Sequence, residues 1–245
     1  MLGSVLDLFY PPRCAGCARG DWPFCASCSD ALLPIDEPMC RRCGRPTDEP
    51  LSYCFDCPPP PIAVARAPFL FRGPVRSAIH KLKFSGWRGV ADALGDAMAA
   101  VNVFRPDAIT WVPLARLRLA ERGYDQARAL ALVVGAHLDR PVQPFLRRDD
   151  AVGSQARRSG LDRRVAMQGV FRSAGRVPPQ RVLLVDDVLT TGSTAAACAR
   201  ILRDEGAGEI GLLTAARAIS GGAPARYTRR GLSSGSVVAR GTSPR

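Results

Sequence analysis

The residues best suited to chemistry stand in one string, Val182–Thr194, which reads VLLVDDVLTTGST. An apolar run ends in two adjacent carboxylates, Asp186 and Asp187, and a loop of hydroxyl residues and glycine leads into an expected helix. Backbone N–H groups at a helix start bind phosphate, and carboxylates accept hydrogen bonds from the two hydroxyls of a sugar diol. The string therefore predicts a site for a ribose 5-phosphate. The alternative, a strand end followed by an ordinary helix cap, leaves most of the string unexplained.

A second group of reactive residues consists of eight cysteines before residue 58, arranged as four Cys-x-x-Cys pairs. Each pair can direct two thiolates at one tetrahedral ion, so the eight ligands predict two closed zinc sites, which are structural because they leave no open coordination position. Disulfides, a redox pair and iron–sulfur ligation are the alternatives. Sequential pairing is the simpler arrangement, and a cross-brace stays open. Sequential pairing gives two sets of ligands: Cys14, Cys17, Cys25 and Cys28, then Cys40, Cys43, Cys54 and Cys57.

The elements that must position these residues alternate between strand and helix after residue 62, as in a doubly wound parallel α/β sheet. Such sheets bind ligands on the loops that follow the carboxyl ends of strands, here the loops after Val112 and Val185. The expected strands are Ala67–Phe71, Ala108–Val112, Arg181–Val185 and Glu209–Ala216. One expected helix begins at Gly73, and three others cover Val90–Phe104, Tyr124–Leu138 and Ser193–Glu205.

Composition and charge divide the 245 residues into three parts. Residues 1–61, the expected double zinc-ribbon module, carry a net charge of −3, and the α/β domain at 62–219 carries +10. The tail at 220–245 carries +5, has little apolar content and is expected to be disordered. A basic body favours polyanionic ligands, although an arginine-rich genome composition is the alternative cause.

The first residues and the apolar runs indicate the cellular location that we expect for the protein. Met1–Tyr10 is apolar but contains Asp7 and lacks a basic start, so we expect a short packing helix there and not a signal peptide. The apolar runs are shorter than the ~18 residues that a membrane helix needs. We therefore expect a cytoplasmic protein without membrane insertion.

The string at Val182–Thr194 resembles the phosphoribosyl pyrophosphate (PRPP) signature of type I phosphoribosyltransferases. Together with the four cysteine pairs, it makes the chain similar to the ComF family of competence-associated, phosphoribosyltransferase-like proteins, from Cys14 to about Ala218. Further matching segments are His80–Phe84, Val112–Leu114, Arg122–Gln126 and Gln155 with Arg163, Arg164 and Phe171. The resemblance implies a type I phosphoribosyltransferase fold behind an N-terminal double zinc ribbon.

The resemblance also implies residue roles. Asp186 and Asp187 would hold the ribose hydroxyls, and Pro113 and Leu114 would form the pyrophosphate loop. Arg116 or Arg122 would supply positive charge to the pyrophosphate, and Arg147–Arg164 would be a flexible lid. The 5-phosphate would be wrapped by Thr190, Thr191, Gly192, Ser193 and Thr194. Lys81 and Lys83 stand two apart on an expected helix, so at most one of them should point at the site.

The function implied is Mg²⁺-dependent transfer of phosphoribosyl from PRPP to an unidentified acceptor, linked to DNA uptake through the family's association with competence. The alternative is a non-catalytic, PRPP-sensing protein that binds single-stranded DNA, which the basic body also favours. A competence helicase or another uptake protein is a candidate partner. A purely structural zinc scaffold explains least, because it leaves the string with two carboxylates without a role.

Overall fold

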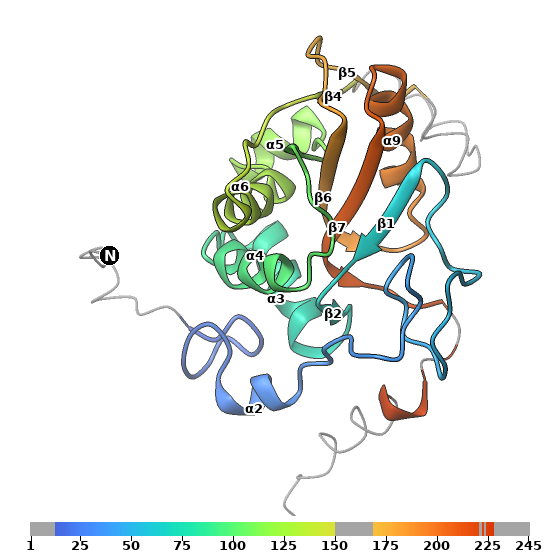
Figure 1. Ribbon diagram of the computed structural model, residues 1–245. Helices are drawn as coiled ribbons and strands as arrows, with labels where there is room; N and C mark the ends of the chain where they lie inside the picture. The colour runs from blue at the N-terminus through green and yellow to red at the C-terminus, as the bar shows by residue number, and fades with distance from the viewer. Residues whose placement is uncertain (1–12, 150–168, 221, 223, 228–245) are drawn as a thin grey trace, which may run out of the picture.

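A computed structural model describes residues 13–149, 169–220, 222 and 224–227 of the chain. Its centre is a parallel sheet in the order β1-β7-β6-β3, and β2 pairs with β7 beyond the end of β1 (Figure 1). The strands of this sheet are β1 (Ile62–Arg66), β2 (Phe69–Leu70), β3 (Ala108–Trp111), β6 (Arg181–Leu189) and β7 (Glu209–Arg217). A separate antiparallel pair consists of β4 (Leu146–Arg148) and β5 (Phe171–Ser173).

Helices cover both faces of the sheet (Figure 1). Successive residues of a strand point to opposite faces, and the two cores follow this alternation along β6. Leu183 and Val185 pack with α3 (Gly73–Phe84), α4 (Val90–Ala100) and α6 (Gln126–Leu138), whereas Val182 and Leu184 pack with α9 (Ser193–Asp204). The predicted doubly wound parallel sheet is therefore confirmed.

Several predicted boundaries were wrong. The strand predicted at Ala67–Phe71 is only Phe69–Leu70. The strand predicted to stop at Val185 continues to Leu189, because β6 keeps pairing with β7 past the two carboxylates. The helix from Val90 ends at Ala100 and not at Phe104, because the side chain of Asn102 bonds the backbone N–H and C=O of Phe104. The helix expected from Tyr124 starts at Gln126, since the Asp125 carboxylate caps its first turn.

Several short elements escaped the sequence analysis. They are β1, β4, β5, α2 (Ala26–Asp30) and α5 (Arg116–Arg122). All are too short for a reliable periodic signal, and β1 begins directly after four consecutive prolines, Pro58–Pro61. The predicted N-terminal helix and residues 150–164 of the predicted lid lie outside the described residues.

The start of the C-terminal tail packs against the zinc-ribbon module. Tyr227 is only 2% exposed, and its hydroxyl accepts a hydrogen bond from the Asp36 N–H at 3.0 Å. Arg226 donates to the carbonyls of Pro38 and Thr47. The prediction of disorder from residue 220 is therefore wrong for residues 224–227, because an aromatic ring and a guanidinium in this segment find partners far away in the sequence. Residues 228–245 of the tail lie outside the described part.

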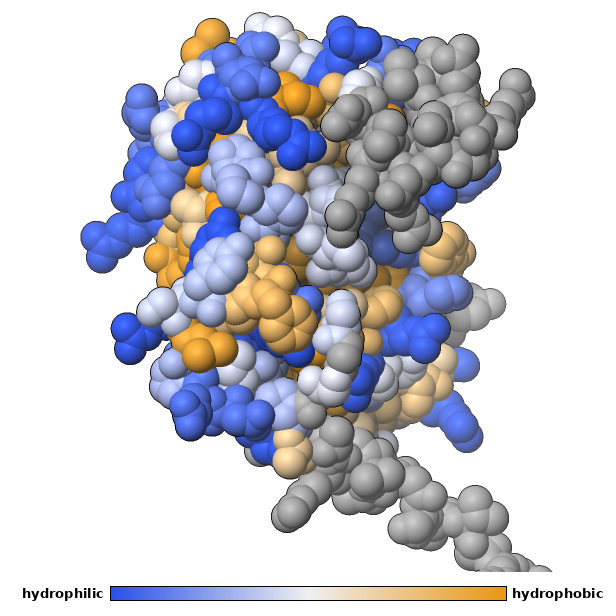
Figure 2. Space-filling model, turned by 90° about the vertical axis from the view of Figure 1, so that its right-hand side faces the viewer, coloured by the Kyte–Doolittle hydropathy of each residue, from blue (hydrophilic) through white to orange (hydrophobic). Residues whose placement is uncertain are grey.

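On the face seen in Figure 2, hydrophilic residues surround smaller groups of apolar ones. Among the described residues, the helices are all too short or too polar to cross a bilayer.

Candidate functional site

The two signature carboxylates lie near the carboxyl end of β6, on opposite faces of the sheet. Asp187 contacts Lys83 of α3 and Gln126 of α6, whereas Asp186 lies on the side of α9, where its charge acts on the Cys198 thiol. This division follows from the unexpected length of β6, because neighbouring residues of a strand alternate between faces. The structure thus brings the carboxylates to one edge of the sheet but gives them different surroundings.

Asp187 is buried at the centre of a polar network. Its Oδ1 accepts a hydrogen bond from the Lys83 Nζ at 2.6 Å, and its Oδ2 accepts one from the Gln126 Nε2 at 3.0 Å. The Oε1 of Gln126 in turn accepts from the Arg122 Nη1 at 2.8 Å. Both oxygens of Asp187 therefore have protein partners, and the Lys83 ammonium balances the carboxylate charge. Of the two lysines on α3, only Lys83 points at the site, because Lys81 donates to backbone carbonyls of the zinc-ribbon module.

Asp186 has a different balance of interactions. Burial, reinforced by the negative charge of Asp187, raises the pKa of Asp186 well above its ordinary value. Its Oδ1 accepts a hydrogen bond from the Asp187 N–H at 2.8 Å, and this contact acts in the opposite direction. Nearby, the Cys198 thiol is fully buried and burial raises its pKa, as is typical of an unreactive core cysteine.

The hydroxyl-rich loop turns directly from β6 into α9. Gly192 has φ = +75°, a conformation that glycine adopts without strain, and it is the N-cap residue of α9. The Thr191 and Ser193 hydroxyls lie 2.9 Å apart, and the Ser193 N–H donates to the Thr191 Oγ1 at 3.4 Å. Thr190 and Thr191 are exposed, and Thr194 is partly exposed. Hydroxyls and helix N–H groups thus converge at the surface where β6 ends, which is a suitable cradle for a phosphate.

The loop after β3 is less open than the sequence suggests. Pro113 is buried, and the Leu114 N–H already donates to the Asp125 carboxylate at 3.0 Å. Arg116 is exposed at the start of α5, while Arg122 at the end of α5 joins the Asp187 network through Gln126. Of the two arginines that we considered for a pyrophosphate group, Arg122 is therefore the one linked to the signature carboxylates.

A cavity of about 640 Å³ opens between the end of α3 and α5, next to this network. Its cations are Lys83, Arg118 and Arg122, and the Arg122 guanidinium lies over the Phe84 ring, 4.7 Å from its centroid. The cavity is lined by Lys83, Phe84, Gly86, Arg118, Glu121, Arg122 and Tyr124. We did not single out Arg118, although its spacing of four residues from Arg122 would have placed both on one helix face. That signal was lost because α5 was not predicted.

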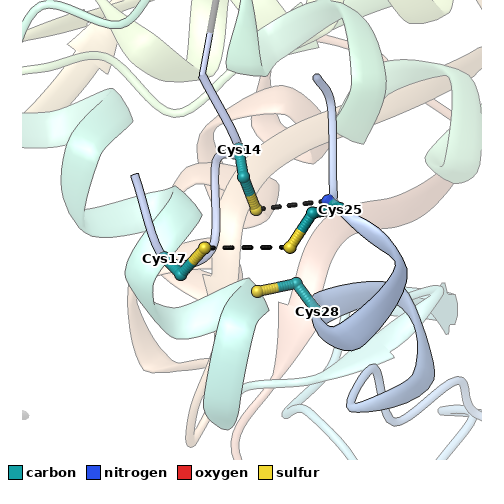
Figure 3. A group of neighbouring side chains, drawn as sticks. All are labelled: Cys14, Cys17, Cys25 and Cys28. Carbon is teal, nitrogen blue, oxygen red and sulfur yellow. Dashed lines mark hydrogen bonds between the residues drawn. The ribbon is translucent and has the colours of Figure 1, made fainter. Parts of the chain in front are cut away.

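The cysteines form two clusters with the predicted sequential pairing. Cys14, Cys17, Cys25 and Cys28 form the first, shown in Figure 3 with their sulfur atoms turned toward one another, and Cys40, Cys43, Cys54 and Cys57 form the second. Within each cluster the sulfur atoms lie within 4.8 Å of one another, and the nine described cysteines are all free thiols.

The sulfur spacing tests whether zinc fits these clusters. Tetrahedral zinc with bonds of about 2.3 Å places its sulfur ligands about 3.8 Å apart. The observed separations are 3.4 Å for Cys43–Cys54, 3.7 Å for Cys17–Cys25 and Cys40–Cys57, and 3.9 Å for Cys54–Cys57. Both clusters therefore fit zinc, and four thiolates would close each site to substrate.

Both zinc clusters contact the elements that carry the ligand site. Lys81 of α3 donates to the carbonyls of Ala15 and Gly16, beside the first cluster. The buried Arg217 at the end of β7 donates to the carbonyls of Cys43 and Asp56, at the second. The zinc-ribbon module is thus an integral support of the sheet.

Comparisons with known proteins agree with this geometry. A double zinc ribbon domain model matches residues 5–58, and a phosphoribosyl transferase domain model matches residues 119–238. The DNA utilization protein YhgH of Escherichia coli K12 is 31% identical over 208 residues, which is 79% of this chain and 89% of the relative. Competence protein F of Haemophilus influenzae is 30% identical over 229 residues, 86% of this chain and 99% of the relative.

A more distant relative and one solved structure complete the comparison. Competence protein ComFC of Streptococcus pneumoniae is 24% identical over 192 residues, 76% of this chain and 84% of the relative. A solved structure of glutamine PRPP amidotransferase from B. subtilis, complexed with ADP and GMP, aligns with 51% of this chain and with 26% of the amidotransferase chain. The TM-score is 0.38 and the sequence identity is 22%. With its two cysteine clusters, its parallel sheet and the relatives at 30–31% identity, the chain belongs to the ComF family of competence proteins, which joins a double zinc ribbon to a phosphoribosyltransferase domain.

Proposed function

We propose that this protein binds PRPP and transfers its phosphoribosyl group to an acceptor. One observation supports this most directly: a carboxylate pair near the end of β6 stands three residues before the hydroxyl-lined turn that starts α9. In a ligand complex, Asp186 would accept hydrogen bonds from the ribose hydroxyls. The turn would bind the 5-phosphate through the N–H groups and hydroxyls of Thr190, Thr191, Gly192, Ser193 and Thr194.

The pyrophosphate group would lie on the side of β3 and α5. Pro113 and Leu114 form the loop there, and Arg122 is held by Gln126 and by the face of Phe84, so its guanidinium is oriented before ligand arrives. Arg116 is exposed near the same loop. A guanidinium fixed in place stabilises a phosphoanhydride leaving group without a reorganisation cost at the moment of reaction.

The reaction would break the bond between ribose C1 and the pyrophosphate oxygen and form one from C1 to the acceptor, with pyrophosphate leaving with the bonding electrons. Asp186 and Asp187 would stand near the positive charge that develops on the ribose ring, and the arginines near the negative charge on the leaving group. Mg²⁺, held mainly by oxygens of PRPP, would supply further neutralisation of the pyrophosphate.

The biological setting that we propose is DNA uptake, because relatives at 30–31% identity are named as competence and DNA utilization proteins. A cytoplasmic location, contact with single-stranded DNA and contact with an uptake protein remain predictions from the sequence.

Calorimetric titration with PRPP and Mg²⁺ tests the proposal. We expect Asp186→Asn to weaken PRPP binding at least tenfold, the loss of about one charge-assisted hydrogen bond. Asp204→Asn changes an exposed carboxylate on α9 and is the matched control, for which we expect wild-type affinity. Wild-type affinity in Asp186→Asn would refute the assignment. Pyrophosphate release with candidate acceptors, with and without single-stranded DNA, then separates an enzyme from a protein that only binds PRPP.

A further inference from the structure

One of the two signature carboxylates has its partners inside the protein. The oxygens of Asp187 are engaged by Lys83 and Gln126, and the Asp187 side chain is only 8% exposed. A carboxylate in this state is poorly placed to receive a sugar hydroxyl. Either Asp187 is structural, or one of its two partners leaves when ligand binds.

Lys83 is the partner able to leave. Its side chain is 24% exposed and it lines the cavity between α3 and α5 as well as bonding Asp187. Gln126, in contrast, is buried and also bonded to Arg122. Lys81 and Lys83 are the only lysines in a chain with 34 basic residues, so arginine is the usual cation of this protein. An ammonium on a flexible stem changes partners more readily than a guanidinium, whose planar fork favours one fixed geometry.

The cavity provides a reason for the exchange. Lys83, Arg118 and Arg122 bring three positive charges to its walls, and Glu121 is its one acidic lining residue within the described part of the chain. A multiply charged anion entering this cavity would attract the Lys83 ammonium away from a single carboxylate. Asp187 would keep its bond to Gln126, so it would stay oriented when its other oxygen became free.

We propose that Lys83 is a positioning residue that changes partner: it holds Asp187 in the free protein and turns to the pyrophosphate group of PRPP in the α3–α5 cavity, which frees Asp187 for the ribose. This inference rests on the proposed function, since it assigns the pyrophosphate end of the same ligand to a specific cavity. It couples the two ends of the site, because the anion must arrive before the second carboxylate can bind sugar.

Binding of three probes in the presence of Mg²⁺ tests this exchange: PRPP, pyrophosphate and ribose 5-phosphate, which lacks the pyrophosphate. For Lys83→Met we expect PRPP and pyrophosphate to bind at least tenfold more weakly, while ribose 5-phosphate stays within about threefold of wild type. Arg76→Met removes an exposed cation from the same helix and should bind all three probes as the wild type does.

The outcomes separate this inference from the proposed function. Equal weakening of PRPP and ribose 5-phosphate binding in Lys83→Met would mean that the lysine is merely structural, and unchanged PRPP binding would mean that it has no role. Either result overturns the exchange, whereas the proposal that the protein binds PRPP stands. A wild-type protein that binds none of the probes would overturn both.

Amine labelling tests the exchange without removing Lys83. Acetylation followed by peptide mass spectrometry measures how far Lys83 is modified relative to Lys81, which serves as the internal reference. We expect Asp187→Asn to raise the relative reactivity of Lys83 severalfold, because the ammonium loses its partner, and Mg²⁺-pyrophosphate to suppress that rise. No rise, or no protection by pyrophosphate, would overturn the inference.

Discussion

Replacing Gly192 by alanine tests whether the zinc-ribbon module forms one wall of the phosphate loop. Gly192 has φ = +75°, and a Cβ added to it would lie 2.6 Å from the Pro58 Cβ and 3.1 Å from the Pro58 Cα. Pro58 directly follows the zinc ligand Cys57. The substitution therefore strains the backbone and also drives the loop against the second zinc cluster.

The two effects can be separated by a control with the same backbone conformation. Gly175 has φ = +77°, and a Cβ added there meets no atom within 4 Å. Alanine in this conformation costs about 1–2 kcal/mol, which is our expectation for Gly175→Ala. Overpacking against a neighbour that cannot move adds about 1–3 kcal/mol. For Gly192→Ala we therefore expect a total loss of about 2–5 kcal/mol in the free energy of unfolding.

Urea denaturation followed by circular dichroism measures both variants. In a double-mutant cycle, Pro58→Gly removes the Cβ that the new methyl group meets, so it should recover part of the loss in Gly192→Ala. If Gly192→Ala and Gly175→Ala prove equally destabilising, Pro58 does not limit the loop, and the zinc-ribbon module does not form one of its walls. Titration with ribose 5-phosphate on the same variants shows whether the displaced loop also loses phosphate affinity.

Three further predictions concern the metal sites, the carboxylate pair and the tail. We expect two zinc ions per chain, which a chelator should release in two phases, and the fast phase should come from the first cluster because Cys17 is exposed. Cys17→Ser should remove the fast phase. Release of both ions from the wild type in a single phase would contradict this prediction. The raised pKa of Asp186 means that the folded state binds the proton more tightly than the unfolded chain, so this carboxyl lowers stability as pH rises. Asp186→Asn should therefore stabilise the protein near pH 8 by on the order of 1 kcal/mol, measured by thermal unfolding, and the stability difference between variant and wild type should vanish toward pH 4. A stability difference that does not change with pH would argue against a buried charge at Asp186. Tyr227→Phe should cost about 0.5–1.5 kcal/mol of stability in urea denaturation by removing the bond from Asp36, and no loss would mean that the tail start does not pack.

Much of the site could be predicted from the sequence because its signals are local. A zinc knuckle needs two cysteines three positions apart, and a phosphate loop needs glycine and hydroxyls next to a helix start. The four cysteine pairs and Val182–Thr194 carry these requirements within a few residues each. The alternation of strands and helices likewise indicated the parallel sheet, since each element has its own periodicity.

The tertiary structure decided what those local signals could not. The Asp187 network joins residues separated by 104 positions for Lys83 and 61 for Gln126, and Arg217 reaches Cys43 across 174 positions. Such contacts depend on which strands are neighbours and which face each helix covers, and no short stretch of sequence encodes that. The same holds for the length of β6. Composition predicts that the strand ends at the two carboxylates, but pairing with β7 continues the strand to Leu189 and turns the carboxylates to opposite faces. The sequence by itself thus determined the chemistry available to this protein, and the packing of the sheet determined which groups are held, covered or left open to a ligand.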